Sequence, residues 1–369
     1  MKNKPQDPEA HRERVYVTKT FLPPIEEYEG YIKQIWNSYQ LTDQGPLLQQ
    51  FEEKAKEYLE VENFHFVSNG TIALQVALKA LEITEGEIIT TPFSYVATTS
   101  AILWERCTPV FVDIESDTFC IDVNKIEEAI TPKTKAIMAV HIYGYPCDVE
   151  QIEAIAKKYN LKVIYDGAHA FGVRYKGKPL LSYGDVSTCS FHATKPFHTI
   201  EGGCVITNSQ ELSDRVELIK HFGQSGDSHH MLGTNAKASE FQAAMGLCNI
   251  KYVDEVFAKR KLISELYDRL IGNRFKTPVI SDKLTQRNYA YYPLVFESEA
   301  QLLVAIKKLK TENIYPRRYF YPSLNTISYV DGQSCPISED ISSRVACLPL
   351  FADMKEEIVE KIAKVINEC

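Results

Sequence analysis

The sequence lacks features that would place the protein in a membrane, in an oxidising compartment or on nucleic acid. No run approaches the roughly 18 apolar residues that a membrane-spanning helix needs, and the polar N-terminus has no apolar segment. The nine cysteines are odd in number and form no Cys-x-x-Cys pair, which fits a reducing compartment. The net charge of −8 argues against partners that need a basic surface, such as nucleic acids and anionic membranes. We therefore expect a cytoplasmic protein.

The chain is long enough for one large domain and a smaller one, with 369 residues of which 44% are hydrophobic. Apolar runs of strand length at 109–114, 136–142 and 161–166 alternate with amphipathic helical patterns. Strands without polar alternation predict a mostly parallel α/β sheet covered by helices on both faces. In such sheets, ligands bind at the carboxyl ends of the strands.

The remaining helical patterns set the expected domain limits. A tail and leading segment at 1–24, frayed over 1–14, should precede a large α/β domain at 25–250 and a small C-terminal α+β domain at 251–369. One long helix at 239–270 is expected to mark the boundary. Other helices are expected at 25–39, 47–59, 211–222, 300–312 and 355–366.

Lys195 is the first candidate for chemistry. The segments Asp185–Phe191 and Cys204–Thr207 are predicted to be short buried strands, which places Lys195 on the turn between them. A single lysine is usually a solvated surface charge. Here the neighbouring side chains are aromatic or small rather than acidic, and a desolvated ammonium has a lowered pKa that makes it a nucleophilic amine.

Two further patterns allow a functional and a plain interpretation. Ser68-Asn-Gly-Thr71 lies between a strand and a helix, where exposed amides can bind an anion, or where Ser68 or Asn69 can simply cap the helix. Asp166 ends a predicted strand, and either caps the next segment or serves as a buried carboxylate 29 residues before Lys195. His169 and Tyr95 are each compatible with ordinary core packing.

The pattern Ser-Phe-His-x-Thr-Lys that ends at Lys195, followed by Glu201-Gly-Gly203, resembles the lysine segment of the DegT/DnrJ/EryC1/StrS sugar aminotransferases. The resemblance extends from Phe21-Leu-Pro-Pro to Cys347-Leu-Pro-Leu. It implies the type I fold of PLP-dependent transferases, similar to aspartate aminotransferase, and pyridoxal 5′-phosphate (PLP) as cofactor, held covalently by Lys195.

The resemblance also assigns roles to individual residues. Asp166 would keep the pyridine nitrogen protonated, because a carboxylate beside it raises the pKa of that nitrogen. His169 would lie close to the ring, Tyr95 would stack on it, and Lys195 would act as general acid and base. The cofactor phosphate would be held by Gly70, Thr71, Ser190 and, from the neighbouring subunit of a homodimer, Asn235. Most family members have Arg where this chain has Lys237, which puts a bidentate contact there in doubt.

The basic and aromatic stretch Arg317-Arg-Tyr-Phe-Tyr321 is either a solvated surface or a substrate site. Two arginines supply planar donors for a diphosphate, and Tyr319 and Tyr321 supply contacts for a sugar, so the resemblance favours Arg317, Arg318, Tyr319 and Tyr321 as substrate-binding residues. The pair His229-His230 has no Cys, Asp or Glu partner at ligand spacing, so we expect no metal site there.

The expected activity is transfer of an amino group from L-glutamate to a nucleotide-linked keto-sugar, without nucleic-acid or membrane partners. The pattern resembles most the branch that aminates C4 of dTDP-4-keto-6-deoxyglucose to dTDP-4-amino-4,6-dideoxyglucose, a precursor of bacterial surface polysaccharides such as the lipopolysaccharide O-antigen. Amination at C3, or of a UDP-linked 4-keto-N-acetyl sugar, is the alternative within the family.

Three rival functions remain in view. A PLP-dependent sugar dehydratase would carry His at the position of Lys195. A non-catalytic sensor or regulator could reuse the fold, since fold alone does not determine function. Such regulators usually carry an N-terminal DNA-binding domain, for which residues 1–24 leave no space. A nucleotide-binding module without PLP would be colourless when purified.

Overall fold

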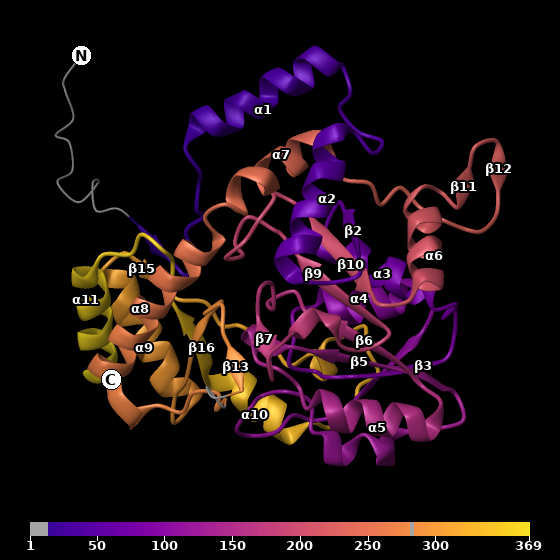
Figure 1. Cartoon of the computed structure of the whole chain (residues 1–369). Helices are drawn as coiled ribbons and strands as arrows, with labels where there is room; N and C mark the ends of the chain where they lie inside the picture. Colours follow the sequence, from indigo (N-terminus) through magenta and orange to yellow (C-terminus); the bar gives the residue numbers. More distant parts are fainter. Residues whose placement is uncertain (1–13, 281–283) are drawn as a thin grey trace, which may run out of the picture.

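A computed structural model describes residues 14–280 and 284–369 (Figure 1). Its central sheet has seven strands in the order β2-β10-β9-β6-β5-β3-β4. β10 runs antiparallel to both neighbours, and the other neighbouring pairs are parallel, so the prediction of a mostly parallel α/β sheet is confirmed. The strands are β2 (Asn63–Val67), β3 (Glu87–Thr90), β4 (Thr108–Phe111), β5 (Thr134–Val140), β6 (Lys162–Asp166), β9 (Val186–Ser190) and β10 (Gly203–Thr207).

Alternate side chains of these strands enter two different hydrophobic cores. In β6, Val163 and Tyr165 belong to the core on one face, and Ile164 belongs to the core on the other. Because both faces are covered, the strands show no polar alternation. The first core packs against α2 (Pro46–Leu59) and α5 (Val149–Tyr159), and the second against α3 (Gly70–Ala80), α4 (Ala97–Trp104) and α6 (Gln210–Lys220).

The prediction of one long helix over 239–270 was wrong, because this stretch forms α7 (Glu240–Asn249) and α8 (Val253–Ile271). At the end of α7, the buried side-chain amide of Asn249 donates to the carbonyl of His198 (2.9 Å). Neither Gly nor Pro marks the break in the sequence. The spacing of apolar residues therefore could not predict this hydrogen bond or the turn beside it.

A separate core lies beyond this turn, near the expected domain boundary at 250 and 251. It forms around an antiparallel strand pair and includes side chains of α8. The other elements of this core are β14 (Tyr292–Val295), β16 (Val345–Leu348), α9 (Glu299–Thr311) and α11 (Glu356–Asn367). β1 (Val15–Tyr16) pairs in parallel with β15 (Ile314–Tyr315), so the leading segment joins the C-terminal core.

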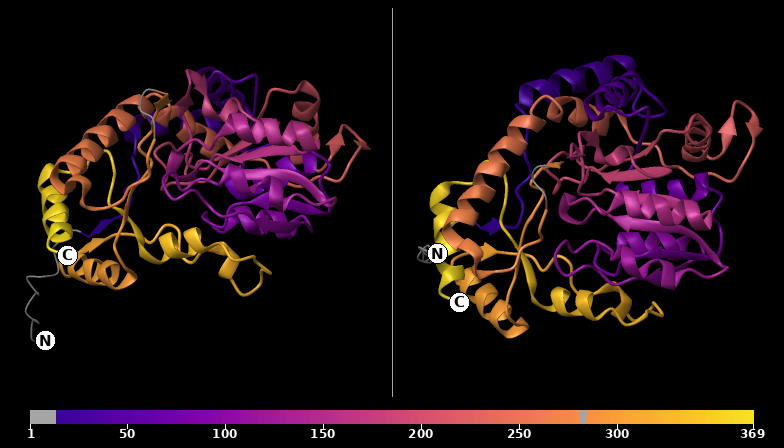
Figure 2. Two further views of the ribbon diagram at one scale, coloured as in Figure 1. Left: turned by 90° about the horizontal axis from the view of Figure 1, so that it is seen from below. Right: turned by 60° about the horizontal axis from the view of Figure 1, so that its bottom comes forward.

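The segment that carries α10 (Pro336–Arg344) returns from this small core to the large sheet. Buried Asp113, which follows β4, accepts hydrogen bonds from the backbone N–H groups of Ile337 (3.0 Å) and Ser338 (2.9 Å). Figure 2 shows this yellow segment running along the part of the chain that forms the large sheet. The two parts of the chain are therefore joined at a second place besides the turn before α8.

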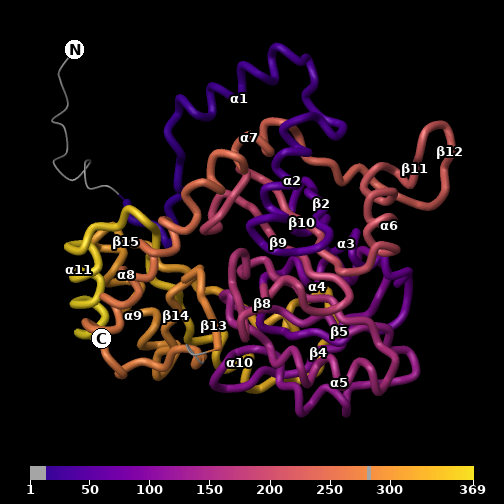
Figure 3. The backbone as a smooth tube through the Cα atoms, in the orientation of Figure 1, coloured from indigo at the N-terminus to yellow at the C-terminus, as the bar shows by residue number. Residues whose placement is uncertain are grey.

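The remaining elements lie at the periphery. α1 (Ile25–Ser38) packs on α7, where the Tyr28 hydroxyl donates to the carbonyl of Phe241 (3.2 Å). A hairpin of β11 (Gln224–Ser225) and β12 (Ser228–His229) projects beyond α6 (Figure 3). A small sheet contains β7 (Arg174–Tyr175), β8 (Lys178–Pro179) and β13 (Thr285–Gln286).

Nearly all of the predicted frayed tail at 1–14 lies outside the described residues, which begin at Arg14. Over the two described ranges, the structure contains no helix that is both long and apolar enough to cross a bilayer.

Candidate active site

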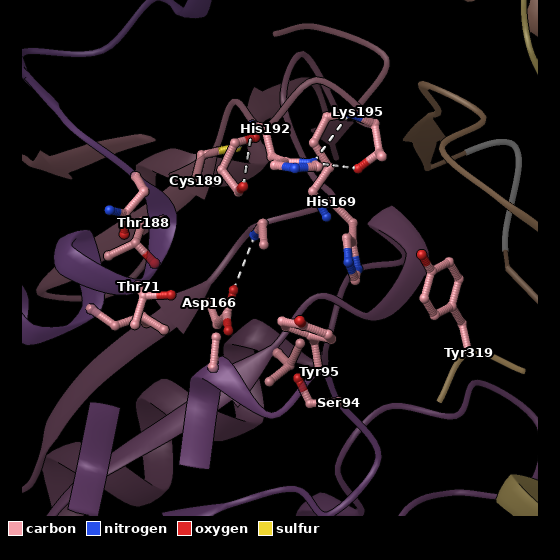
Figure 4. Close-up of a pocket in the computed structure, with 18 of the residues that line it drawn as sticks. Thr71, Ser94, Tyr95, Asp166, His169, Thr188, Cys189, His192, Lys195 and Tyr319 are labelled. Carbon is pink, nitrogen blue, oxygen red and sulfur yellow. Dashed lines mark hydrogen bonds between the residues drawn. The ribbon is translucent and has the colours of Figure 1, made fainter. Parts of the chain in front are cut away.

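A cavity of about 650 Å³ opens at the carboxyl ends of β6 and β9. The N-terminus of α3 lies at one side, and Tyr319 enters from the opposite side (Figure 4). The structure brings most of the predicted site residues together around this cavity: Gly70, Thr71, Tyr95, Asp166, His169, Ser190, Lys195, Arg317 and Tyr319. The other three, Asn235, Arg318 and Tyr321, do not line it.

Lys195 lies between β9 and β10, as predicted from the two apolar runs. The turn is fixed by a hydrogen bond from the backbone N–H of Lys195 to the carbonyl of His192 (2.8 Å). Burial lowers the pKa of the Lys195 amine, and it outweighs the opposite effect of the nearby Asp166. The Tyr291 hydroxyl lies 3.4 Å from Lys195 Nζ. The local environment therefore shifts this amine toward its neutral, nucleophilic form.

Asp166 ends β6 and is 5% exposed. Burial raises the pKa of its carboxyl group, whereas hydrogen bonds from Thr98 and from the backbone of Ala168 oppose this shift. Thr98 Oγ1 donates to Asp166 Oδ2 (2.8 Å), and the Ala168 N–H donates to Oδ1 (3.1 Å). Each carboxylate oxygen therefore has one protein donor, and the group lies at the cavity wall.

His169 is held as a neutral imidazole. Its Nδ1 faces the backbone N–H of Tyr143 (3.1 Å), which can only donate, so the ring proton resides on Nε2. Burial lowers the pKa of this histidine well below its ordinary value. The ring stacks with Phe320 at 5.6 Å and meets the edge of Tyr291 at 5.1 Å. These aromatic contacts fix the ring plane at the cavity.

The strand-turn-helix at Ser68-Asn-Gly-Thr71 forms one end of the cavity. Asn69 caps α3, because its Oδ1 accepts from the backbone N–H of Ile72 (2.9 Å). The amides of the first helical turn have no carbonyl partner within the helix, which makes this end suitable for an anion. A side chain at position 70 would place its Cβ 2.9 Å from the Ser190 Cβ, so only Gly leaves this space open.

The two adjacent arginines point to different places. Arg317 is exposed and lines the cavity, with its guanidinium 5.4 Å from the centre of the Tyr319 ring. Arg318 instead donates to a carboxylate oxygen of Glu299 (2.7 Å) and lies over the Tyr321 ring at 3.5 Å. The sequence could not separate them because both stand in the same irregular basic segment.

Tyr95 and Asn235 occupy the exposed margin of this region. Tyr95 lines the cavity with 57% of its surface exposed. Asn235 is exposed, follows the β11–β12 hairpin and bridges to His221 in the backbone. The nearby Lys237 forms an ion pair with Asp43 (2.9 Å). Asn235 therefore lies outside the cavity of its own chain.

Sequence reasoning missed several cavity residues. Ser94 lines the cavity, and Thr98, which does not line it, bonds to both Ser94 and Asp166. Ser94 lies in the loop before α4, so helical spacing in the sequence does not single out the pair. Tyr291 stands among other aromatic residues and gave no signal. At the mouth, His192 Nε2 lies 3.5 Å from Glu201 Oε1. In the part of the chain that the structure describes, no group of three potential metal ligands occurs.

Comparison with known proteins gives consistent matches along nearly the whole chain. The DegT/DnrJ/EryC1/StrS aminotransferase family matches residues 25–367. A dTDP-4-amino-4,6-dideoxy-D-glucose transaminase of Shigella dysenteriae is 42% identical over 363 residues, covering 96% of this chain and 98% of that protein. A transaminase of the same name from Escherichia coli is 41% identical, covering 95% and 97%. The crystal structure of DesI in the presence of its TDP-sugar product is similar, with a TM-score of 0.91, 29% identity and coverage of 98% and 94%.

Proposed function

Because the chain belongs to the DegT/DnrJ/EryC1/StrS aminotransferase family, we propose that it transfers an amino group from L-glutamate to C4 of dTDP-4-keto-6-deoxyglucose, with PLP as cofactor. The product is dTDP-4-amino-4,6-dideoxyglucose, the sugar nucleotide in the names of the two similar transaminases. The observation that supports the proposal most directly is the lysine of lowered pKa that shares one cavity with a buried carboxylate (Figure 4).

The chemistry of the cavity residues fits this cofactor. The first-turn amides of α3 and the Ser190 hydroxyl offer donors to a phosphate, and Gly70 leaves the space between them free. Lys195 offers an amine to an aldehyde, and Asp166 offers a carboxylate to a ring nitrogen. When bound, the cofactor supplies an electron sink for the carbon from which a proton is removed.

Lys195 performs the proton transfers in the proposed reaction. Its ε-amine takes the proton from Cα of the amino donor, and it can do so because burial lowers the pKa of this group toward the working pH. The same amine returns a proton when the keto-sugar is aminated. One residue thus moves the proton in both halves of the reaction. Because the donor would leave as a keto acid before the keto-sugar is aminated, we expect ping-pong kinetics.

Asp166, His169 and Tyr95 orient the cofactor ring in this proposal. Asp166 would accept a hydrogen bond from the protonated ring nitrogen, and the positive charge there would favour the ionised carboxylate despite its burial. His169 presents a neutral ring whose plane is fixed by Phe320. Tyr95 covers the open side, where a flat π-face suits stacking.

The sugar nucleotide is proposed to enter past Arg317 and Tyr319. Arg317 has no acidic partner within the described ranges, and its planar guanidinium suits a diphosphate. We leave Arg318 and Tyr321 out of this substrate site, because Arg318 is paired with Glu299 away from the cavity. Asn235 is proposed to reach the cofactor phosphate of a second subunit, so the active form is a homodimer.

The substrate assignment is tested with purified enzyme, glutamate and three candidate acceptors. These are dTDP-4-keto-6-deoxyglucose, its 3-keto isomer and a UDP-linked 4-keto-N-acetyl sugar, and NMR determines the position of the new amine. We expect turnover of the first compound with the amine at C4. Exclusive turnover of either of the other two would overturn the substrate assignment but not the aminotransferase activity. Thymine and uracil differ by one methyl group, worth about 1 kcal/mol in an apolar pocket. Some turnover of the UDP-sugar beside that of the dTDP-sugar is therefore compatible with the assignment.

A further inference from the structure

Two buried hydroxyl groups near Asp166 are not explained by the roles assigned so far. Thr98, on α4, is fully buried, and Ser94, in the loop before it, is 3% exposed. Thr98 Oγ1 lies 2.8 Å from Asp166 Oδ2, and Ser94 Oγ lies 2.8 Å from Thr98 Oγ1. The three side chains thus form a continuous chain of hydrogen bonds, in which Asp166 and Ser94 line the cavity and Thr98, which does not, joins them.

The direction of these hydrogen bonds follows from the donor count. An ionised carboxylate can only accept, so the single O–H of Thr98 points to Asp166. The Thr98 oxygen is then free to accept, and the Ser94 O–H is its donor. Hydrogen bonds in such a chain polarise one another, which strengthens the bond that reaches the charged group.

We propose that Thr98, supported by Ser94, is a positioning residue that aims the Asp166 carboxylate at the ring nitrogen of the cofactor. With Thr98 on Oδ2 and the Ala168 N–H on Oδ1, the carboxylate cannot rotate without breaking a hydrogen bond. Its remaining lone pairs are available on the cavity side. The inference rests on the proposed PLP chemistry, and it adds two residues to the machinery of that site.

The chain itself supplies a matched control one residue away. Thr99 lies on the same helix and is equally buried. Its hydroxyl has no hydrogen-bond partner among the described residues. Thr98→Val and Thr99→Val therefore make the same chemical change at the same depth, and only the first removes a contact with Asp166. If the loss of a buried hydroxyl only disturbs packing, the two variants should behave alike, or one should lose stability without a change at the cofactor ring.

The experiment compares Thr98→Val, Thr98→Ser, Ser94→Ala and Thr99→Val with the wild type. The ring nitrogen of bound ¹⁵N-labelled PLP is observed by NMR, the affinity of the apoenzyme for PLP is measured by titration, and kcat is determined with glutamate. We expect Thr98→Val to shift the ¹⁵N signal toward the unprotonated form and to lower kcat about tenfold or more, because a hydrogen bond to a charged group is lost. Thr98→Ser should restore both values, and Thr99→Val should match the wild type.

The outcomes separate this inference from the function on which it rests. A wild type that binds no PLP would overturn the proposed function and the inference together. If the ring nitrogen is protonated in the wild type and its ¹⁵N signal is the same in Thr98→Val and Thr99→Val, the inference alone is overturned. If Thr98→Val does not fold, Ser94→Ala decides, because it leaves the Thr98 contact in place. A smaller ¹⁵N shift in the same direction supports the hydroxyl chain, and no shift overturns it.

Discussion

Burial shifts the two central groups of the cavity in opposite directions. It lowers the pKa of the Lys195 amine and raises that of the Asp166 carboxyl, so each group moves toward its neutral form. Each also favours the charged form of the other, but this attraction is the weaker effect in both cases. A ligand with an aldehyde at one end and a basic ring nitrogen at the other suits both groups. The aldehyde is attacked by the neutral amine, and the protonated ring nitrogen gives the buried carboxylate a cationic partner.

Removal of the lysine amine should abolish the reaction. We expect Lys195→Ala to lose the absorbance of covalently bound cofactor and to show no transamination, while the far-ultraviolet circular dichroism spectrum stays that of the wild type. The variant keeps the phosphate cradle of Gly70 and Ser190, so it should still retain some cofactor non-covalently. Turnover comparable to the wild type would contradict the role of Lys195.

Site residues that stand beside regular strands could be predicted from the sequence. Site residues in irregular segments could be predicted only in part. Asp166 and Lys195 stand beside buried strands, whose apolar runs are easily recognised. Arg317 and Arg318 look equivalent in sequence, and only the ion pair with Glu299 separates them. Tyr291 approaches the lysine through tertiary packing, which no local pattern encodes.

At the scale of elements, a partly buried ionic cluster joins α6 to α2 and β2. Lys220 on α6 is 1% exposed and pairs with Glu52 on α2 (3.2 Å) and with Glu217 one turn earlier (2.8 Å). Glu217 also meets His65 on β2 (3.2 Å). Removing one partner of a buried charge is costly because the other is left uncompensated. This cluster therefore holds the helix against the sheet edge.

The cluster predicts a pH-dependent contribution to stability. Hydrogen bonds and charges from His65 and Lys220 lower the pKa of the Glu217 carboxyl below its ordinary 4.5, although burial opposes them. A lowered carboxyl pKa stabilises the fold above pH 4.5, and this stabilisation is lost as the pH falls below that value. Glu217→Gln should reduce stability at pH 7 by about 1 kcal/mol, a modest figure because solvent screens this partly exposed group.

The measurement is thermal unfolding of both proteins at pH 7 and at pH 4. The difference in Tm between Glu217→Gln and the wild type should shrink at the lower pH. A difference that stays constant would show that the carboxylate charge does not contribute. Lys54, whose partner Glu57 is exposed on α2, offers a control: Glu57→Gln should change stability little at either pH.

Some helix limits are set by local sequence and others by contacts with distant segments. The start of α7 has a capping box of Ser239 and Gln242, a pattern that is visible in the sequence. Its end depends on the contact between Asn249 and His198, which comes from a distant segment. The expected long helix failed for that reason, while α9 and α11 agreed with their apolar spacing.

At the scale of the whole molecule, the position of Asn235 predicts assembly. The loop that carries it also exposes Phe222 and Leu232, and the end of α1 exposes Trp36 and Tyr39. Exposed apolar side chains of this size often mark an interface between proteins. A second copy of the chain would cover such side chains and bring Asn235 to a cofactor phosphate.

We therefore expect a homodimer by light scattering, and Asn235→Ala should weaken PLP affinity without dissociating the dimer. A mixed dimer gives the sharper test, because one subunit with Lys195→Ala and one with Asn235→Ala should contain a single intact composite site. Such a mixture should recover part of the activity that neither parent has at limiting PLP. An active monomer at nanomolar concentration would contradict the shared site.

The pairing of β1 with β15 has a consequence for how the protein is made. Val15 leaves the ribosome about 300 residues before its partner Ile314 is synthesised. At roughly 5–20 residues per second, the first strand waits on the order of 15–60 s for its place in the fold. The large sheet can close once β10 has emerged, since β2 pairs with it. The nascent chain should therefore complete its large domain while its leading segment is still unpaired and open to chaperones.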